Sequence, residues 1–188
     1  MLTVLVAKLY PYMVVFACPC EHKGDDEYVT KRMALWLQGC GVSQFTYMCD
    51  QEGALRTMMQ GMLANMKASD SWVGAIPEHS AVGESQSNGT AERAVRHVED
   101  MVRCHKAHLE HCIGKTIPVH HPVVSWLVEY VAVLISKYHL TADGTTGYQN
   151  LHGQIANERL TQFGENHHFY IPKKRRAKLD LVWSTGIT

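Results

Sequence analysis

Apolar and polar positions follow two kinds of pattern along the chain, and together these patterns predict an α/β protein. Short apolar runs bounded by turn-forming residues predict strands at residues 2–9, 13–18, 42–49 and 72–76, with Pro11 in the first turn. Longer stretches with apolar side chains at helical spacing predict helices at residues 26–38 and 53–66. A largely apolar stretch at residues 122–138 predicts a helix buried against a sheet.

The longest helical pattern begins at Glu92. Ser87 and Asn88 are favourable N-cap residues, and Gly89 allows the chain to turn tightly before the helix. Apolar positions at spacings of three and four are expected to form its buried face: Val95, Val98, Val102, His105, Leu109 and Cys112. The helix dipole stabilises the ionised form of a first-turn carboxylate such as Glu92 by about 0.3–1 kcal/mol.

Asp50 stands roughly 40 residues before Glu92, at the carboxyl end of the strand predicted for residues 42–49. Open α/β sheets place their ligands at that end of their strands. Two converging carboxylates can hold a hard divalent cation. A glutamate at the start of a helix is by itself more often an ordinary surface residue, but the loop Gln86-Ser87-Asn88-Gly89 before it favours a functional site.

The segment Gln-Ser-Asn-Gly-Thr-Ala-Glu-Arg at residues 86–93 resembles the loop and helix of retroviral and retrotransposon integrase cores that carry the third catalytic acid. Asp50, within Cys-Asp-Gln-Glu-Gly, resembles the second acid of that family. The predicted order of strands and helices is similar to the ribonuclease H-like fold with its first strand absent. Residues 163–186 resemble the region that follows the core in copia-type elements.

The resemblance implies a ribonuclease H-like mixed sheet flanked by helices over residues 1–140, with the first strand missing. A linker and the start of a small C-terminal β region are expected over residues 141–188. The implied activity is divalent-metal-dependent DNA strand transfer, with Asp50 and Glu92 as catalytic acids and ligands of Mg²⁺ or Mn²⁺. Residues expected to contact DNA are Gln86, Asn88, Arg93 and Arg96. A homo-oligomer in the nucleus or the cytoplasm is also implied.

The chain departs from the family pattern at the first acid, which lies in the first strand of integrase cores. Asp25 is the earliest aspartate, but it lies in a predicted turn and is not assigned this role. The chain is therefore expected to be truncated at its N-terminus and, as it stands, not to cut or join DNA at a useful rate. Glu84 remains a rival to Glu92, because the spacing from Asp50 to Glu92 is longer than the family's usual one.

Two alternative interpretations follow from this departure. The chain could be a catalytically dead, DNA-binding remnant of a retrotransposon. It could instead be a protein-interaction fragment, because the edge left by an absent strand can pair with a strand of another chain.

The formal net charge is zero, but the basic residues are not evenly distributed. A cluster near the C-terminus contains Lys173, Lys174, Arg175, Arg176 and Lys178. Such a cluster is typical of phosphate binding or of a nuclear import signal, and equally of a solvated loop between two strands. DNA is the partner that the resemblance favours.

The cysteines and the hydropathy of the chain bear on its redox compartment, on zinc binding and on membrane association. The six cysteines form no disulfide-like framework, which favours a reducing compartment. Cys18, Cys20 and His22 have the spacing of a partial zinc site, but a second pair of ligands would have to come from a distant segment. No apolar run reaches the length of a membrane span, so no membrane association is expected.

Overall fold

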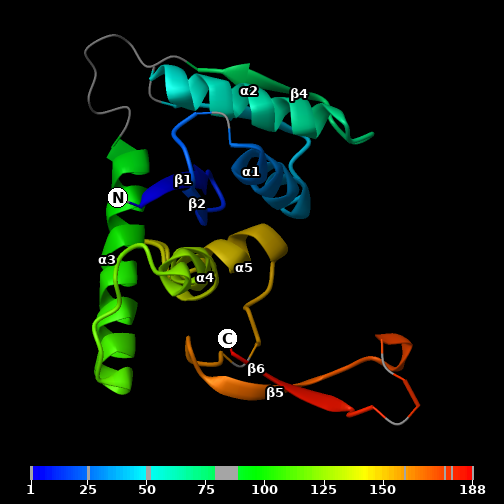
Figure 1. Cartoon of the computed structure of the whole chain (residues 1–188). Coiled ribbons are helices and arrows are strands. Elements are labelled where there is room, and N and C mark those ends of the chain that lie inside the picture. The colour runs from blue at the N-terminus through cyan, green and yellow to red at the C-terminus, as the bar shows by residue number, and fades with distance from the viewer. Residues whose placement is uncertain are drawn as a thin grey trace.

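The computed structural model describes residues 2–24, 26–49, 52–78, 89–158, 160–175, 177–178 and 180–187 (Figure 1). The strands of this part are β1 (Thr3–Leu9), β2 (Val14–Cys20), β3 (Gln44–Tyr47), β4 (Gly74–Pro77), β5 (Asn166–Tyr170) and β6 (Trp183–Ile187). The helices are α1 (Glu27–Gly39), α2 (Gly53–Lys67), α3 (Gly89–Ile113), α4 (Pro122–Tyr138) and α5 (Gly147–His152). The predicted order of elements is confirmed, although β3 and β4 are shorter than expected.

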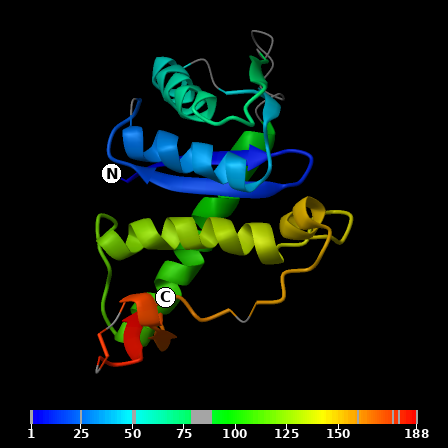
Figure 2. The same cartoon turned by 90° about the vertical axis from the view of Figure 1, so that its right-hand side faces the viewer.

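The antiparallel hairpin of β1 and β2 lies at the centre of the fold, with α1 on one side and α4 on the other (Figure 2). Successive side chains of a strand point to opposite faces, and β2 follows this rule. Phe16 and Cys18 join a core made with α1 and α2. Val15 and Ala17 join a second core made with α3 and α4. The hairpin therefore separates two hydrophobic cores and contributes to both.

Both cores are filled by long aliphatic side chains. In the first core, Met62 and Met66 of α2 are fully buried beside Val29 of α1. In the second core, Leu127 and Val131 of α4 are fully buried. A fully buried aliphatic side chain contributes about 1.5–3 kcal/mol, so these positions account for much of the stability of the fold.

Local signals in the sequence define the starts of α1 and α4. The carboxylate of Asp26 accepts a hydrogen bond from the Val29 N–H at 3.1 Å, as an N-cap residue does. His121 caps α4 through its Nδ1, which accepts from the Val123 N–H at 3.2 Å. Pro122 follows at the first helical position, where its missing N–H is not needed. The residue range predicted for α4 is confirmed.

The buried face of α3 differs from the predicted one. Val98 is buried as expected, but Val95 and Cys112 are exposed. Ala94 takes the place predicted for Val95. Helical geometry gives the reason. Ala94, four positions before Val98, lies on the same face as Val98, whereas Val95, three positions before it, lies toward the edge of the narrow contact stripe.

The strands of the described residues form three two-stranded sheets, β1–β2, β3–β4 and β5–β6, and not one continuous mixed sheet. The pair β3–β4 is parallel, whereas the other two pairs are antiparallel. The mixed α/β class is confirmed. A single ribonuclease H-like sheet stays a prediction.

Phe163 anchors the segment that leads to the β5–β6 hairpin. It is buried against Tyr130 of α4, with the ring centroids 5.1 Å apart. The Tyr130 hydroxyl donates a hydrogen bond to the Thr161 carbonyl at 3.0 Å.

Among the described helices, none has the length and apolarity needed to cross a bilayer.

Ser136 of α4 satisfies backbone groups at the edge of β2 that faces away from β1. Its hydroxyl oxygen accepts a hydrogen bond from the Val15 N–H at 2.8 Å. The hydroxyl hydrogen is shared between the carbonyls of Ala132 at 2.8 Å and Val15 at 3.2 Å. One side chain of α4 thus takes the place of a neighbouring strand.

Replacing Ser136 with Ala should leave the Val15 N–H without a partner in a half-buried position and destabilise the fold by about 1–3 kcal/mol. The matched control is Ser125→Ala, because Ser125 lies on the same helix and no side-chain hydrogen bond of it is present among the described residues. The control should change stability by less than about 0.5 kcal/mol. Urea unfolding followed by circular dichroism measures both. Equal midpoints for the two variants would contradict the role of Ser136.

Candidate functional site

Glu92 lies in the first turn of α3, and its side chain is exposed. Asp50, Gln86 and Asn88 lie outside the described residues, as do the rejected Asp25 and the rival Glu84. The convergence of Asp50 with Glu92 therefore stays a prediction. The nearest described part of the Asp50 strand is β3, whose last residue, Tyr47, accepts a hydrogen bond from the Glu78 N–H at 2.8 Å.

The three arginines of α3 differ in their pairing. Arg103 forms ion pairs with Glu99 at 3.0 Å and Asp100 at 2.5 Å, so its charge is offset on the helix itself. Arg93 and Arg96 pair with no carboxylate among the described residues, and both are exposed. The Arg93 Nε donates to the Gly89 carbonyl at 3.0 Å, which leaves its terminal nitrogens available. Among the arginines of α3, the two that are predicted to contact DNA are therefore those whose charge no described carboxylate offsets.

Arg93 lines a pocket of about 280 Å³ together with Lys8, His97, His139 and Thr141. The rings of His97 and His139 meet nearly edge to face, with centroids 4.3 Å apart. Burial, and next the Arg93 guanidinium, lower the pKa of Lys8. Burial, His139 and Lys8 lower the pKa of His97, while Asp100 opposes the shift. Basic side chains from β1, α3 and the end of α4 thus line one pocket, and one of them, Arg93, directly follows Glu92 in the sequence.

Lys8, His97 and His139 were not predicted as functional residues from the sequence. One signal pointed to Lys8, because it is the only charged residue in the otherwise apolar strand Thr3–Leu9. A second signal pointed to His97, because it follows Arg93 by one helical turn. His139 carried no such signal, since only folding brings the end of α4 to α3.

The predicted basic cluster lies between β5 and β6. Lys173, Lys174 and Arg175 form a short 3₁₀ helix, and these residues and Lys178 are exposed. Arg176 lies outside the described residues. The rings of Tyr170 and Trp183 pack edge to face at 5.6 Å where the hairpin meets this loop. Exposed positive charge beside half-exposed aromatic rings is an arrangement that suits a nucleic-acid backbone and its bases.

The partial zinc motif is not a metal site in the described residues. Cys18 and Cys20 are buried in β2 and belong to the first core. Burial, reinforced by Glu129 and Cys20, raises the pKa of Cys18 to about 12, which disfavours the thiolate that zinc binds. No group of three or more metal-binding side chains converges in the part of the chain that the structure describes. These cysteines act as small apolar core residues.

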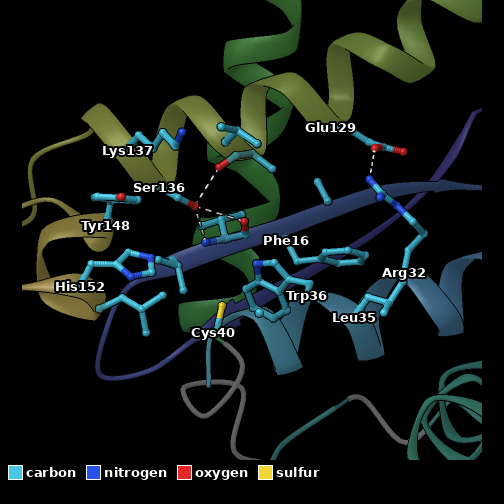
Figure 3. A pocket seen from close by; sticks show the side chains of 17 residues that line it. Phe16, Arg32, Leu35, Trp36, Cys40, Glu129, Ser136, Lys137, Tyr148 and His152 are labelled. Carbon is cyan, nitrogen blue, oxygen red and sulfur yellow. Dashed lines mark hydrogen bonds and ion pairs between the residues drawn. The ribbon is translucent and has the colours of Figure 1, made fainter. Parts of the chain in front are cut away.

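A larger pocket of about 450 Å³ lies at the free edge of β2, between α1, α4 and α5 (Figure 3). The ion pair of Arg32 and Glu129, at 2.6 Å, bridges α1 and α4 at one end, and His152 lies at the other. Its walls are mostly apolar, and none of the predicted site residues lines it. Size alone therefore does not identify the functional site, and the smaller pocket beside Arg93 is the better candidate.

No protein-family model matches the chain, and no curated protein matches it by sequence. Solved structures do match. The chain is similar to the catalytic core domain of BIV integrase, with a TM-score of 0.54 and 16% identity over 80% of this chain and 85% of that one. It is also similar to a chain of the simian T-cell lymphotropic virus intasome in complex with PP2A regulatory subunit B56 gamma. There the TM-score is 0.56 and the identity 10%, over 97% of this chain and 60% of that chain.

These similarities establish that the chain has the fold of a retroviral integrase catalytic core. The integrase resemblance indicated by residues 86–93 is thereby supported at the level of the fold. The copia-type assignment and the N-terminal truncation stay predictions.

The burial of the cysteines leads to a test by alkylation. Iodoacetamide at about pH 8 should modify the exposed Cys104 and Cys112 first and Cys18 last, because the Cys18 thiol is buried and holds its proton. Site-resolved mass spectrometry follows each residue over time. The unfolded protein in urea is the control, in which the rates should become similar. Native Cys18 reacting as fast as Cys112 would contradict its place in the core.

Proposed function

We propose that the chain is an integrase-type core that binds DNA and holds a divalent metal ion for DNA strand transfer. The observation that carries the proposal is the exposed Glu92 at the start of a long helix, in a fold shared with integrase catalytic cores. The motif around Glu92 carries the same resemblance independently of the fold. Mg²⁺ or Mn²⁺ is the proposed ion, because carboxylate oxygens are the ligands that these cations prefer.

In this proposal Asp50 and Glu92 are the metal ligands. A bound ion there supplies positive charge to the reacting phosphate and lowers the pKa of an attacking hydroxyl or water. The exposure of Glu92 fits this role, since a metal ligand must be reachable by the substrate. Gln86 and Asn88 of the preceding loop are proposed to contact the DNA end.

Two positively charged regions support DNA as the partner. The first is formed by Arg93 and Arg96, which have no carboxylate partner among the described residues. The second is the basic cluster between β5 and β6, of which Lys173, Lys174, Arg175 and Lys178 are exposed and Arg176 lies outside the described residues. Because the net charge of the whole chain is zero, local concentrations of charge and not the overall charge must attract DNA.

Metal binding tests the two acids. A site with two carboxylates should bind Mn²⁺ weakly, with a dissociation constant on the order of millimolar. Asp50→Asn should abolish binding, and Glu92→Gln should weaken it. The matched controls are Asp70→Asn and Glu99→Gln, because both carboxylates are exposed and lie outside the proposed site. Isothermal titration calorimetry measures the affinities. If Asp50→Asn binds as well as the parent protein, the assignment is wrong.

DNA binding tests the basic cluster. If four or five of its side chains contact phosphates, the logarithm of the association constant should fall linearly with the logarithm of the salt concentration, with a slope of about −3.5 to −4.5. Replacing all five residues with Ser should flatten the slope and weaken binding to every duplex alike, because phosphate contacts carry no sequence information. The control replaces two exposed lysines elsewhere, Lys67 and Lys115, and should leave the slope unchanged. Fluorescence anisotropy with short duplexes provides the measurement. An unchanged slope in the five-residue variant would show that the cluster is a solvated loop.

A further inference from the structure

The pocket beside Arg93 combines residues from three separate parts of the fold. Lys8 comes from β1, Arg93 and His97 come from α3, and His139 caps the end of α4. Figure 1 shows α3 passing beside the β1–β2 hairpin and α4. At about 280 Å³ the pocket lies just below the usual range for drug-sized ligands, so its size suits a small ligand.

No acidic side chain lines this pocket, as far as the described residues show. Asp100 of α3, which acts on His97, forms an ion pair with Arg103 at 2.5 Å. Asp143, in the loop after α4, accepts hydrogen bonds from the hydroxyls of Thr141 and Thr145. Lys8 and Arg93 form no ion pair with a described carboxylate. The pocket therefore collects positive charge that the described part of the protein does not neutralise.

We propose that this pocket binds a phosphate group, held by Lys8 and Arg93 and flanked by His97 and His139. The Arg93 fork can donate two parallel hydrogen bonds to one anion, and the Lys8 ammonium adds a point charge from another direction. Donors that approach from several sides match a tetrahedral phosphate group, whether a singly charged diester or a doubly charged free phosphate, better than a planar carboxylate, which a single arginine would satisfy. The phosphate group belongs either to a DNA backbone or to a free phosphate compound.

His97 makes this binding dependent on pH. In the free protein His97 has a lowered pKa, chiefly because of burial and then because of His139 and Lys8. A bound dianion favours the charged ring, so it raises the pKa of a histidine beside it. Between the free and the bound pKa values of His97, affinity increases by up to tenfold for each pH unit of acidification. Asp100 of α3 also favours the charged form of His97, but its carboxylate is paired with Arg103.

Sulfate is the probe for the pocket, because it keeps its double charge between about pH 5.5 and pH 8 and so isolates the titration of the protein. NMR spectra of the histidine rings in the full chain should show saturable sulfate binding at His97 and His139. The affinity should be about tenfold higher at the lower pH. Absence of saturable binding, or an affinity that is the same at both pH values, would overturn the proposal.

Variants separate a specific pocket from general charge attraction. Lys8→Met keeps the apolar stem of the side chain and should reduce sulfate affinity by about tenfold. His97→Gln should remove most of the pH dependence, because His97 is the histidine of the pocket whose pKa is lowered by burial and by its neighbours. Arg103→Gln is the matched control, because Arg103 is exposed and its charge is already paired. If Arg103→Gln weakens sulfate binding as much as Lys8→Met does, the pocket is not the site.

Competition with DNA distinguishes the two sources of the phosphate group. Only this part of the inference rests on the proposed function. If the source is a DNA backbone, a short duplex should displace sulfate, and Lys8→Met should lower the salt slope of DNA binding by about one unit. If the source is a free phosphate, the duplex should leave the His97 and His139 signals unchanged while inorganic phosphate displaces sulfate. Failure of all DNA binding would refute the proposed function and leave the sulfate result standing. Failure of sulfate binding would refute the pocket and leave the basic β5–β6 loop as the DNA contact.

Discussion

The β1–β2 hairpin is the structural constraint on which the rest of the fold depends. Because adjacent residues of β2 point to opposite faces, one strand supplies side chains to both hydrophobic cores. The helices α1 and α2 are held on one face, and α3 and α4 on the other. A one-residue shift in the register of β2 would move its side chains from one core to the other, so the arrangement of the helices depends on this single pairing.

The same hairpin determines where the positive charge collects. Lys8 is carried by β1 toward α3, and the alignment of α4 across the hairpin brings His139 to His97. Acidic residues are abundant on α3, but Glu99 and Asp100 are engaged by Arg103. A chain with no net charge thereby presents a locally positive pocket. The positive charge of the pocket thus arises from which charged side chains form ion pairs with each other, and not from the number of charges in the chain.

The edge of β2 shows how side chains can replace a missing strand. Ser136 meets both backbone groups of Val15, and Pro19 has no N–H to leave unpaired. The same strand, at Val14–Ala17, lines the larger, mostly apolar pocket between α1 and α4. The two pockets therefore differ in kind, since one lies along an apolar strand edge and the other is lined by basic side chains.

The sequence by itself determined the elements whose signals are local. The cap residues Asp26 and His121 and the apolar stretch of α4 define helix boundaries through contacts within a few residues. The motif of residues 86–93 likewise indicated the integrase-type fold that the similarity to BIV integrase supports. Only the tertiary structure decided that Ala94 and not Val95 is buried, that the strands pair in separate small sheets, and that Lys8, His97 and His139 surround one pocket. The physical reason is that these outcomes depend on contacts between segments far apart in the chain, which no local pattern of residues encodes.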